Sequence, residues 1–321
     1  MIMTVYILAP MNRVSGGPEL AHQMCYSINK NTSASAKMCY VDCEAPFDRD
    51  LCIDVPAPAP YEIYKTEHVI SMDEMDKEEN VVVFPEGLTL SMPYIKNAKK
   101  VMWWMSVDNY IVSTRESNFD YIYDNVELHL YQSYYAYDYV QRKKPGVKGM
   151  YLSDYINEAH GKFLYPAELR QDIALYNPVK GYEEVKSFIE NESWLKWVPL
   201  RGLDVPKMVL IMQSSKIYVD FGNHPGKDRI PREAAVNGCC VITNKKGSAA
   251  NDKDVPIPEK YKFDDPSKEA DKIGALLRSI CDDFKTHQDD FGAYREMIHA
   301  EKEKFDEDVI TFIEYFEKQR M

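Results

Sequence analysis

The sequence lacks the closely spaced cysteine pairs that bind zinc or catalyse thiol–disulfide exchange. Its seven cysteines are an odd number, no C-x-x-C pair occurs among them, and most lie in apolar runs such as Cys239-Cys240. This usage indicates buried thiols in a reducing compartment rather than disulfides or a zinc site. The seven histidines show no metal-ligand spacing, and no D-x-D signature falls in a convincing loop. We therefore expect no bound metal.

Long apolar runs and an excess of positive charge are absent as well. No run approaches the roughly 20 residues that a membrane helix needs. The opening MIMTVYILAP is apolar but short, without a basic leader or a small-residue cleavage site, so it predicts a first strand and not a signal peptide. The net charge of −12 disfavours nucleic acid and anionic lipid as partners. We expect a cytoplasmic protein that holds any anionic ligand with a local cluster of cations.

Apolar runs alternate with helical patterns along the chain. Leu20, Met24 and Ile28 have helical spacing in the predicted helix 16–30, and Pro18 suits its first turn. A helical, highly charged tail covers 267–321. Such alternation predicts an α/β protein with mainly parallel sheets. Strands are expected at 4–10, 37–43, 80–86, 99–106, 127–133 and 149–156, and, in a second series, at 172–178, 195–202, 216–222, 239–244 and 260–265, with helices at 181–191, 204–215 and 230–238.

The first loop, MNRVSGGPE (11–19), joins a strand to a helix through Gly16 and Gly17. It matches neither the dinucleotide fingerprint nor a P-loop. Glycines allow a ligand close to the backbone, and a helix start offers free N–H groups. Two interpretations stay open, a cradle for a phosphate or sugar and a plain turn.

Cations gather after two strands of the second series. YNPVKG (176–181) places Asn177 and Lys180 before a helix, where a lysine opposes the helix dipole. This arrangement favours a bound anion, although a solvated surface lysine is the simpler alternative.

The stretch YVDFGNHPGKDRIPREAAVNGCCVIT (218–243) carries three cations between two apolar strands. Lys227 and Arg229 suit a diphosphate, and the next helix start adds its dipole. Glu233, in the first turn of that helix, suits the hydroxyls of a ribose. The alternatives are that Glu233 caps the helix and that Arg232 pairs with a neighbouring acid. Asn223 and His224 complete the candidate donor site, and a structural role in the loop is the alternative for His224.

An acceptor site is expected in the first half of the chain. KVMWWMSVDNYIVS (100–113) places Trp103, Trp104 and Asn109 at a strand end, where indole faces suit sugar rings. Asp108 is positioned to deprotonate an acceptor hydroxyl. The alternative is a buried tryptophan pair and an aspartate that makes a turn or cap. The basic QRKKPGVK (141–148) suits peripheral membrane contact, but a solvated turn is favoured.

Taken in order, SGGPELAHQ, NPVKG, REAAVNGCCVIT and KKGSA resemble a GT-B glycosyltransferase, nearest to the family 4 type. The resemblance implies two Rossmann-like domains facing across a cleft, with a helical C-terminal tail. The implied domains are an acceptor domain (1–165), a nucleotide-sugar domain (166–290) and a C-terminal helix (291–321) that crosses back to the first domain. By position, Gly16 and Gly17 match the N-terminal glycine loop, Lys180 the diphosphate lysine and Glu233 the ribose carboxylate.

The resemblance implies a metal-independent glycosyltransferase of polysaccharide or glycoconjugate assembly. It would move a sugar from a nucleotide-sugar donor to a glycan or glycoconjugate acceptor and need no further cofactor. Two departures from the family pattern stand out. Pro225 occupies the position of a second family glutamate, and no arginine is evident before Lys180, where Arg229 or Lys227 is the candidate replacement. The alternatives are another transferase on the same scaffold, such as a pyruvyl transferase, and a non-catalytic nucleotide- or sugar-binding protein.

Overall fold

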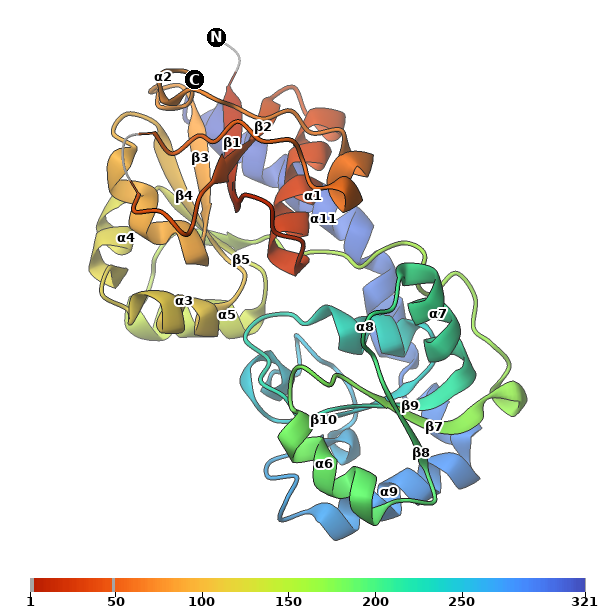
Figure 1. Ribbon diagram of the computed structural model, residues 1–321. Helices are drawn as coiled ribbons and strands as arrows, with labels where there is room; N and C mark the ends of the chain where they lie inside the picture. Colours follow the sequence, from red (N-terminus) through yellow and green to blue (C-terminus); the bar gives the residue numbers. More distant parts are fainter. Residues whose placement is uncertain (1–2, 48–49, 321) are drawn as a thin grey trace. The chain divides into compact units, whose positions relative to one another are not determined.

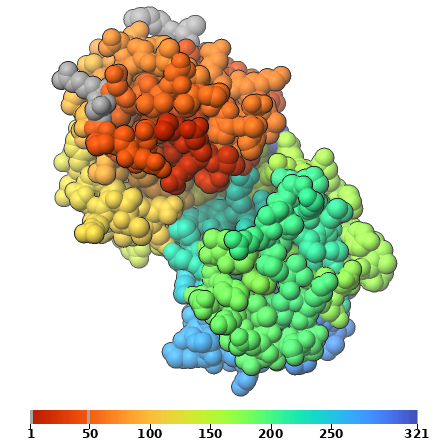
Figure 2. All heavy atoms as spheres, viewed as in Figure 1, coloured from red at the N-terminus to blue at the C-terminus, as the bar shows by residue number. Residues whose placement is uncertain are grey.

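The computed structural model describes residues 3–47 and 50–320 and divides into two compact units (Figure 1). The first comprises Met1–Asp154 and Glu303–Met321, and the second Tyr155–Lys302. Residues 1, 2, 48, 49 and 321, which the expected domains include, lie outside the described part. Figure 2 shows the outer surface of these units, the first mainly in red to yellow and the second mainly in green to blue.

The second unit begins at Tyr155, whereas the sequence analysis placed the boundary after residue 165. Packing explains the difference. Ile156 belongs to the hydrophobic core of the second unit, and Nδ1 of His160 lies 2.7 Å from Nδ2 of Asn237 in the same unit. The irregular segment before the second sheet is therefore held by that sheet's own core.

The first unit is built on one parallel six-stranded sheet. Its order is β2 (Ser35–Val41), β1 (Thr4–Pro10), β3 (Val81–Pro85), β4 (Lys99–Trp104), β5 (Leu128–Tyr131) and β6 (Gly149–Tyr151). Every residue of β3 is buried, as expected for a strand covered on both faces. The predicted strands are confirmed, although β6 ends at Tyr151 instead of 156.

Helices cover the faces of this sheet. The helix after β1 is confirmed as α1 (Gly16–Asn31), and it buries Leu20, Met24 and Ile28. Ser106 caps α3 by accepting the backbone N–H of Asn109 at 3.3 Å. The other elements are η1 (Ala59–Tyr64), α2 (Met72–Met75), η2 (Glu86–Tyr94), α3 (Val107–Thr114), α4 (Phe119–Asn125) and α5 (Tyr134–Lys143).

The second unit has a parallel five-stranded sheet in the order β11 (Lys262–Phe263), β10 (Cys240–Asn244), β9 (Ser215–Asp220), β7 (Gln171–Tyr176) and β8 (Lys196–Pro199). Asp204 caps α7, because its Oδ1 accepts the backbone N–H of Lys207 at 3.0 Å. The last helix begins in the second unit and ends in the first. The other elements are η3 (Ala167–Leu169), α6 (Tyr182–Asn191), α7 (Val205–Ser214), α8 (Arg229–Val236), η4 (Gly247–Ala250), η5 (Glu259–Tyr261), α9 (Ala270–Asp282), α10 (Phe284–Asp289) and α11 (Gly292–Lys318).

Each sheet has one point where the direction of strand addition reverses. In the first unit the chain adds β2 on one side of β1 and then β3 on the other. In the second unit it adds β8 on one side of β7 and then β9 on the other. Open α/β sheets bind ligands outside the carboxyl ends of the strands at such switch points. Among the described residues, no helix is both long and apolar enough to cross a bilayer.

Candidate functional site

Three loops pack together at the switch point of the second unit. They follow β7, β9 and β10, whose carboxyl ends share one edge of the sheet. Gly181 has a φ of +77°, and a Cβ there would lie 2.4 Å from the backbone nitrogen of Gly222. Nδ2 of Asn244 donates to the carbonyls of Phe221 and Gly222 at 2.6 and 2.8 Å. Only a residue without a side chain fits between the first two loops at position 181.

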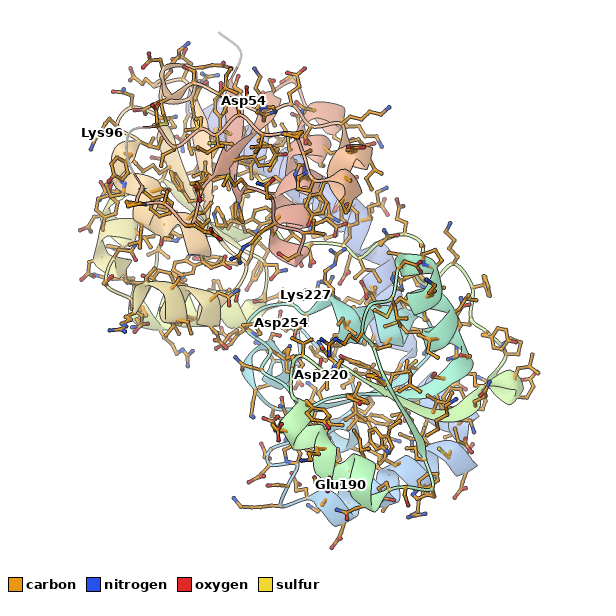
Figure 3. All side chains as sticks on the ribbon, in the orientation of Figure 1. Asp54, Lys96, Glu190, Asp220, Lys227 and Asp254 are labelled. Atoms are coloured by element: carbon orange, nitrogen blue, oxygen red, sulfur yellow. The ribbon has the colours of Figure 1, made fainter. Side chains whose placement is uncertain are left out.

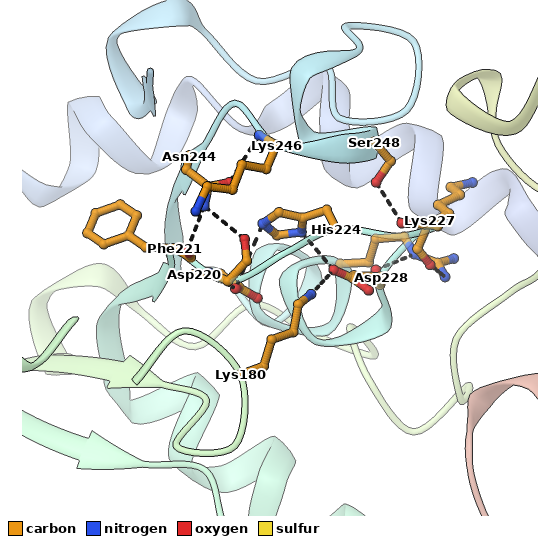
Figure 4. A network of polar contacts seen from close by, with 12 residues as sticks. Lys180, Asp220, Phe221, His224, Lys227, Asp228, Asn244, Lys246 and Ser248 are labelled. Carbon is orange, nitrogen blue, oxygen red and sulfur yellow. Dashed lines mark hydrogen bonds and ion pairs between the residues drawn. The ribbon is translucent and has the colours of Figure 1, made fainter. Parts of the chain in front are cut away.

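A charged network spans these loops (Figure 4). Lys180 forms an ion pair with Oδ2 of Asp228, and Nδ1 of His224 lies 2.7 Å from the same oxygen. On its other side, Nε2 of His224 lies 3.8 Å from Oδ1 of Asp220. The structure thus brings two predicted site residues, Lys180 and His224, to one carboxylate.

The two carboxylates of the network are held firmly. Burial alone would raise the pKa of Asp228, but the hydrogen bond from His224 and the charge of Lys180 outweigh it and hold that pKa below its ordinary value. Asp220 accepts the hydroxyl of Tyr218 at 2.8 Å and the N–H of Gly222 at 3.1 Å. Asp228 is therefore held in its ionised form, and Asp220 is fixed in place by its two hydrogen bonds.

Asp220, His224 and Asp228 also offer three possible metal-ligand atoms within 4.8 Å of one another. The ammonium of Lys180 is paired with Asp228, and the Asp220 carboxylate already accepts two hydrogen bonds. A lysine ammonium in this position repels a cation. The expectation of metal independence remains a prediction, and this geometry agrees better with an anion than with a metal ion.

Two cations of the 218–243 stretch have a structural partner. Lys227, labelled in Figure 3, forms a 2.7 Å ion pair with Oε1 of Glu301 on α11. Arg232 is fully buried and contacts the other oxygen of Glu301, also at 2.7 Å. Its guanidinium further donates to the carbonyls of Lys227 and Asp228. The alternative considered for Arg232, pairing with an acid, is what the structure shows.

The remaining donor-site candidates of the second unit surround the network. Arg229 is the first residue of α8, next to Asp228, and Glu233 follows one turn later. Oε1 of Glu233 lies 3.9 Å from Nε2 of His160. Asn177 accepts the backbone N–H of Val179 at 3.0 Å, which shapes the loop before Lys180, and Asn223 lies exposed in the loop after β9.

The first unit has a pocket of about 420 Å³ at its own switch point. Ends of β1, β3 and β4 line it together with the starts of α1 and η2 and one face of α3. Two of the predicted residues, Gly17 and Asn109, are in its lining, and Gly16 lies beside them at the first position of α1. A larger hollow of about 910 Å³ is lined by Asp76 and Lys96, which precede β3 and β4, so it lies at the amino ends of those strands.

Glu86 also lines this pocket, directly after β3. Its Oε2 accepts the backbone N–H of Met105 at 3.2 Å, and only 7% of the residue is exposed. Burial raises its pKa to about 7, although the backbone N–H groups of Glu86, Met105 and Ser106 oppose the rise. A carboxyl that exchanges its proton near neutral pH is suited to acid–base chemistry.

The same pKa predicts a measurable cost in stability. The folded state binds the Glu86 proton more tightly than the unfolded chain, whose ordinary value is 4.5, so stability is lost as the pH rises from about 4.5 to about 7. We expect Glu86→Gln to gain about 3 kcal/mol in free energy of unfolding relative to the wild type between pH 4 and pH 8. Urea unfolding at a series of pH values measures this gain. Glu78→Gln, at an exposed turn, should show no such trend, and a pH-independent difference for Glu86→Gln would contradict the raised pKa.

The prediction that the tryptophan pair binds an acceptor is wrong, because both side chains are buried in the core of the first unit. Trp103 and Trp104 are both 0% exposed, and their indole N–H groups donate to the Leu152 carbonyl and to Nδ1 of His129, each at 2.9 Å. β4 lies in the middle of the sheet, and its four consecutive residues from Val101 to Trp104 are buried, so both of its faces are covered. Asp108 accepts the hydroxyl of Tyr135 at 2.9 Å and does not line the pocket. In the basic segment, Lys143 and Lys144 pair with acids on neighbouring elements.

Comparison with known proteins resolves the fold. No protein-family model and no curated protein matches the chain. Among solved structures, sucrose-phosphate synthase from Thermosynechococcus elongatus matches with a TM-score of 0.70 at 13% identity, over 99% of this chain and 100% of that one. A glycosyltransferase from Rickettsia africae matches with 0.67 at 12%, over 99% and 98%. HepE from Anabaena, solved in complex with UDP, matches with 0.67 at 10%, over 98% and 100%.

The chain has the GT-B glycosyltransferase fold. Within this GT-B chain, the sequence analysis missed two acids of interest, Glu86 and Asp228. Glu86 directly follows the apolar run NVVVFP, which predicts a strand, and Asp228 directly follows Lys227, a predicted site residue. The rule that ligands bind at carboxyl ends of strands would have found Glu86, because it is the first residue after β3.

Proposed function

We propose that the chain is a glycosyltransferase that uses a nucleoside diphosphate sugar, with UDP as the nucleotide, and binds this donor in the second unit. The observation that carries the proposal is the meeting of Lys180, His224 and the start of α8 at one switch point. Support also comes from HepE, which was solved with UDP and with UDP-glucose. Its fold matches nearly the whole of this chain.

In this proposal the diphosphate is bound by Lys180, by Arg229 and by the positive end of the α8 dipole. An ammonium and a guanidinium stabilise the negative charge that develops on the leaving diphosphate. Lys180 is 26% exposed in its side chain and is held near its place by Asp228, so a bound phosphate has only to replace or join that carboxylate. Pre-positioning reduces the cost of ordering the lysine on binding.

Glu233 is assigned to the ribose hydroxyls, as the resemblance implies, and Asn223 and His224 to the surroundings of the phosphates. Lys227 is assigned to holding its loop, because Glu301 already balances its charge. A glycan or glycoconjugate acceptor, a cytoplasmic setting and independence from metal are parts of the same proposal.

Calorimetric titration with UDP, GDP, dTDP and CMP tests the donor site. We expect UDP to bind and Lys180→Ala to weaken its affinity about 10- to 100-fold, because a charge-assisted hydrogen bond contributes roughly 1.5–3 kcal/mol. Lys268→Ala is the matched control, since this lysine is 82% exposed and forms an ion pair with Asp265 three residues away. Binding of none of the four nucleotides, or equal affinity of Lys180→Ala and wild type, would contradict the proposal.

A further inference from the structure

Two cysteine sulfurs meet in the first unit. The thiol of Cys39, in the edge strand β2, donates to Sγ of Cys52 at 3.6 Å, although the two residues are 13 positions apart in the chain. Cys39 is fully buried, whereas Cys52 is partly exposed. All seven cysteines lie in the described part of the chain, and each is a free thiol. An accessible thiol that contacts a second, buried thiol is a typical arrangement for reversible oxidation.

The backbone holds these two cysteines next to each other. The N–H of Ile53, the residue after Cys52, donates to the carbonyl of Tyr40, the residue after Cys39, at 2.9 Å. Bonded sulfurs are about 2.05 Å apart, so the contact must shorten by about 1.5 Å for a disulfide to form. Cys52 lies in an irregular segment, so its side chain can rotate by this much without breaking a strand or a helix.

The two thiols also differ in acidity. The hydrogen bond from Cys39 lowers the pKa of the Cys52 thiol below its ordinary 9.0. Burial and the charges of Asp50 and Glu74 oppose this change without reversing it. The same hydrogen bond, together with burial, raises the pKa of Cys39 well above 9.0. Because the thiolate is the reactive form of cysteine, Cys52 is the thiol that meets an oxidant first.

We propose that Cys39 and Cys52 form a site of reversible oxidation by peroxide, at which Cys52 reacts first and Cys39 completes a disulfide. The inference is independent of the proposed function. The Cys52 thiolate attacks one oxygen of hydrogen peroxide, the O–O bond breaks, and Cys52 becomes a sulfenic acid as hydroxide leaves.

The second step closes the disulfide. The sulfur of Cys39 attacks the sulfur of the sulfenic acid, the S–O bond breaks, and the hydroxide leaves with the Cys39 proton as water. The hydroxide of the first step takes up the proton that Cys52 lost on ionisation. The two thiols together lose two electrons, and the peroxide is reduced to two molecules of water. A dithiol that supplies two electrons and two protons reverses the reaction.

The disulfide ties together the two ends of the loop that follows β2. Cys43 lies in this loop and lines the pocket of about 420 Å³ at the switch point of the first unit. Its own thiol is exposed and contacts the carbonyl of Val41 at 3.9 Å. Oxidation therefore constrains a loop that borders the pocket, and Cys43 is the nearest competitor for the linkage in the sequence.

The experiment treats the folded protein with hydrogen peroxide, blocks the remaining thiols and maps disulfides by peptide mass spectrometry. We expect two of the seven thiols to be lost, with one linkage that joins Cys39 to Cys52 and that dithiothreitol reverses. Cys39→Ala stops the reaction after its first step, so dimedone should label Cys52 as a sulfenic acid. Cys52→Ser, at a partly exposed position outside the core, should leave Cys39 reduced. Cys43→Ser is the matched control from the same loop and should keep the linkage.

The redox equilibrium shows whether the fold favours this pair. In glutathione buffers, the equilibrium constant for the disulfide should be at least about tenfold greater for the folded protein than in urea, because the fold holds the sulfurs in contact. Seven intact thiols after peroxide treatment, a linkage that needs Cys43, or equal constants in the folded and unfolded protein would each overturn the inference. Oxidation of Cys39 in Cys52→Ser would overturn the order of the two steps.

Discussion

Removing the carboxylate of Glu301 is expected to lower the free energy of unfolding by about 3–5 kcal/mol, as is typical when one partner of a buried ion pair is lost. Its side chain is only 4% exposed and contacts two cations, Lys227 and Arg232, each at 2.7 Å. Glu301→Ala removes the carboxylate that the fully buried Arg232 contacts at 2.7 Å. Urea unfolding of Glu301→Ala and wild type at neutral pH measures the loss.

Two variants make this test specific. Glu301→Gln keeps the shape and one acceptor oxygen, so its loss should lie between those of wild type and Glu301→Ala. Lys302→Ala is the matched control, because the next residue of α11 forms a 3.0 Å pair with Glu158 in which the two side chains are 36% and 69% exposed. We expect it to cost at most about 1 kcal/mol. If Glu301→Ala and Lys302→Ala lower the free energy of unfolding equally, the buried ion pair stabilises the fold no more than an exposed one does.

The Glu301 contact also shows where sequence reasoning ends. Arg232 and Glu301 are 69 positions apart, and nothing in REAAVNG or in the charged tail identifies which acid meets which cation. Burial by a distant helix turns two cations of an apparent anion site into structural groups. Of the cations in the predicted donor site, Lys180 pairs with Asp228 at the switch point, and Arg229 follows Asp228 as the first residue of α8.

Strands and helices were predictable because they depend on local patterns. The fully apolar VVVFP became β3, with both faces covered, and the spacing of Leu20, Met24 and Ile28 became the buried face of α1. Strand ends were less predictable. The apolar run 149–156 continues past β6, since Ile156 belongs to the core of the other unit. A short apolar run does not reveal which of two cores will bury it.

The prediction that Trp103 and Trp104 bind an acceptor was wrong for a related reason. An indole suits a sugar ring and a protein core equally well, and only the position of β4 inside its sheet decides between them. Glu86 is the converse case. A single glutamate after a strand is an ordinary feature of sequence, and its chemistry appears only when the fold buries it beside a pocket. Both cases show that burial, which is set by topology, decides the surroundings of a residue, which residue type alone does not reveal.

Gly181→Ala is expected to destabilise the second unit by about 3 kcal/mol and to weaken UDP binding at the same time. A non-glycine residue at a φ of +77° costs about 1–2 kcal/mol. In addition, the new Cβ would lie 2.4 Å from the backbone nitrogen of Gly222, so the two loops must separate at a further cost of about 1–3 kcal/mol. Because Lys180 precedes Gly181, that separation moves its ammonium away from Asp228.

Gly202→Ala separates the steric effect from the conformational one. Gly202 also has a positive φ, +66°, but no atom lies within 4 Å of the place where its Cβ would be. Its loss should therefore be only about 1–2 kcal/mol, with UDP affinity unchanged. Urea unfolding and calorimetry on both variants give the comparison. If Gly181→Ala binds UDP as well as Gly202→Ala does, the contact between the two loops does not position Lys180, and the donor site proposed at this switch point loses its structural basis.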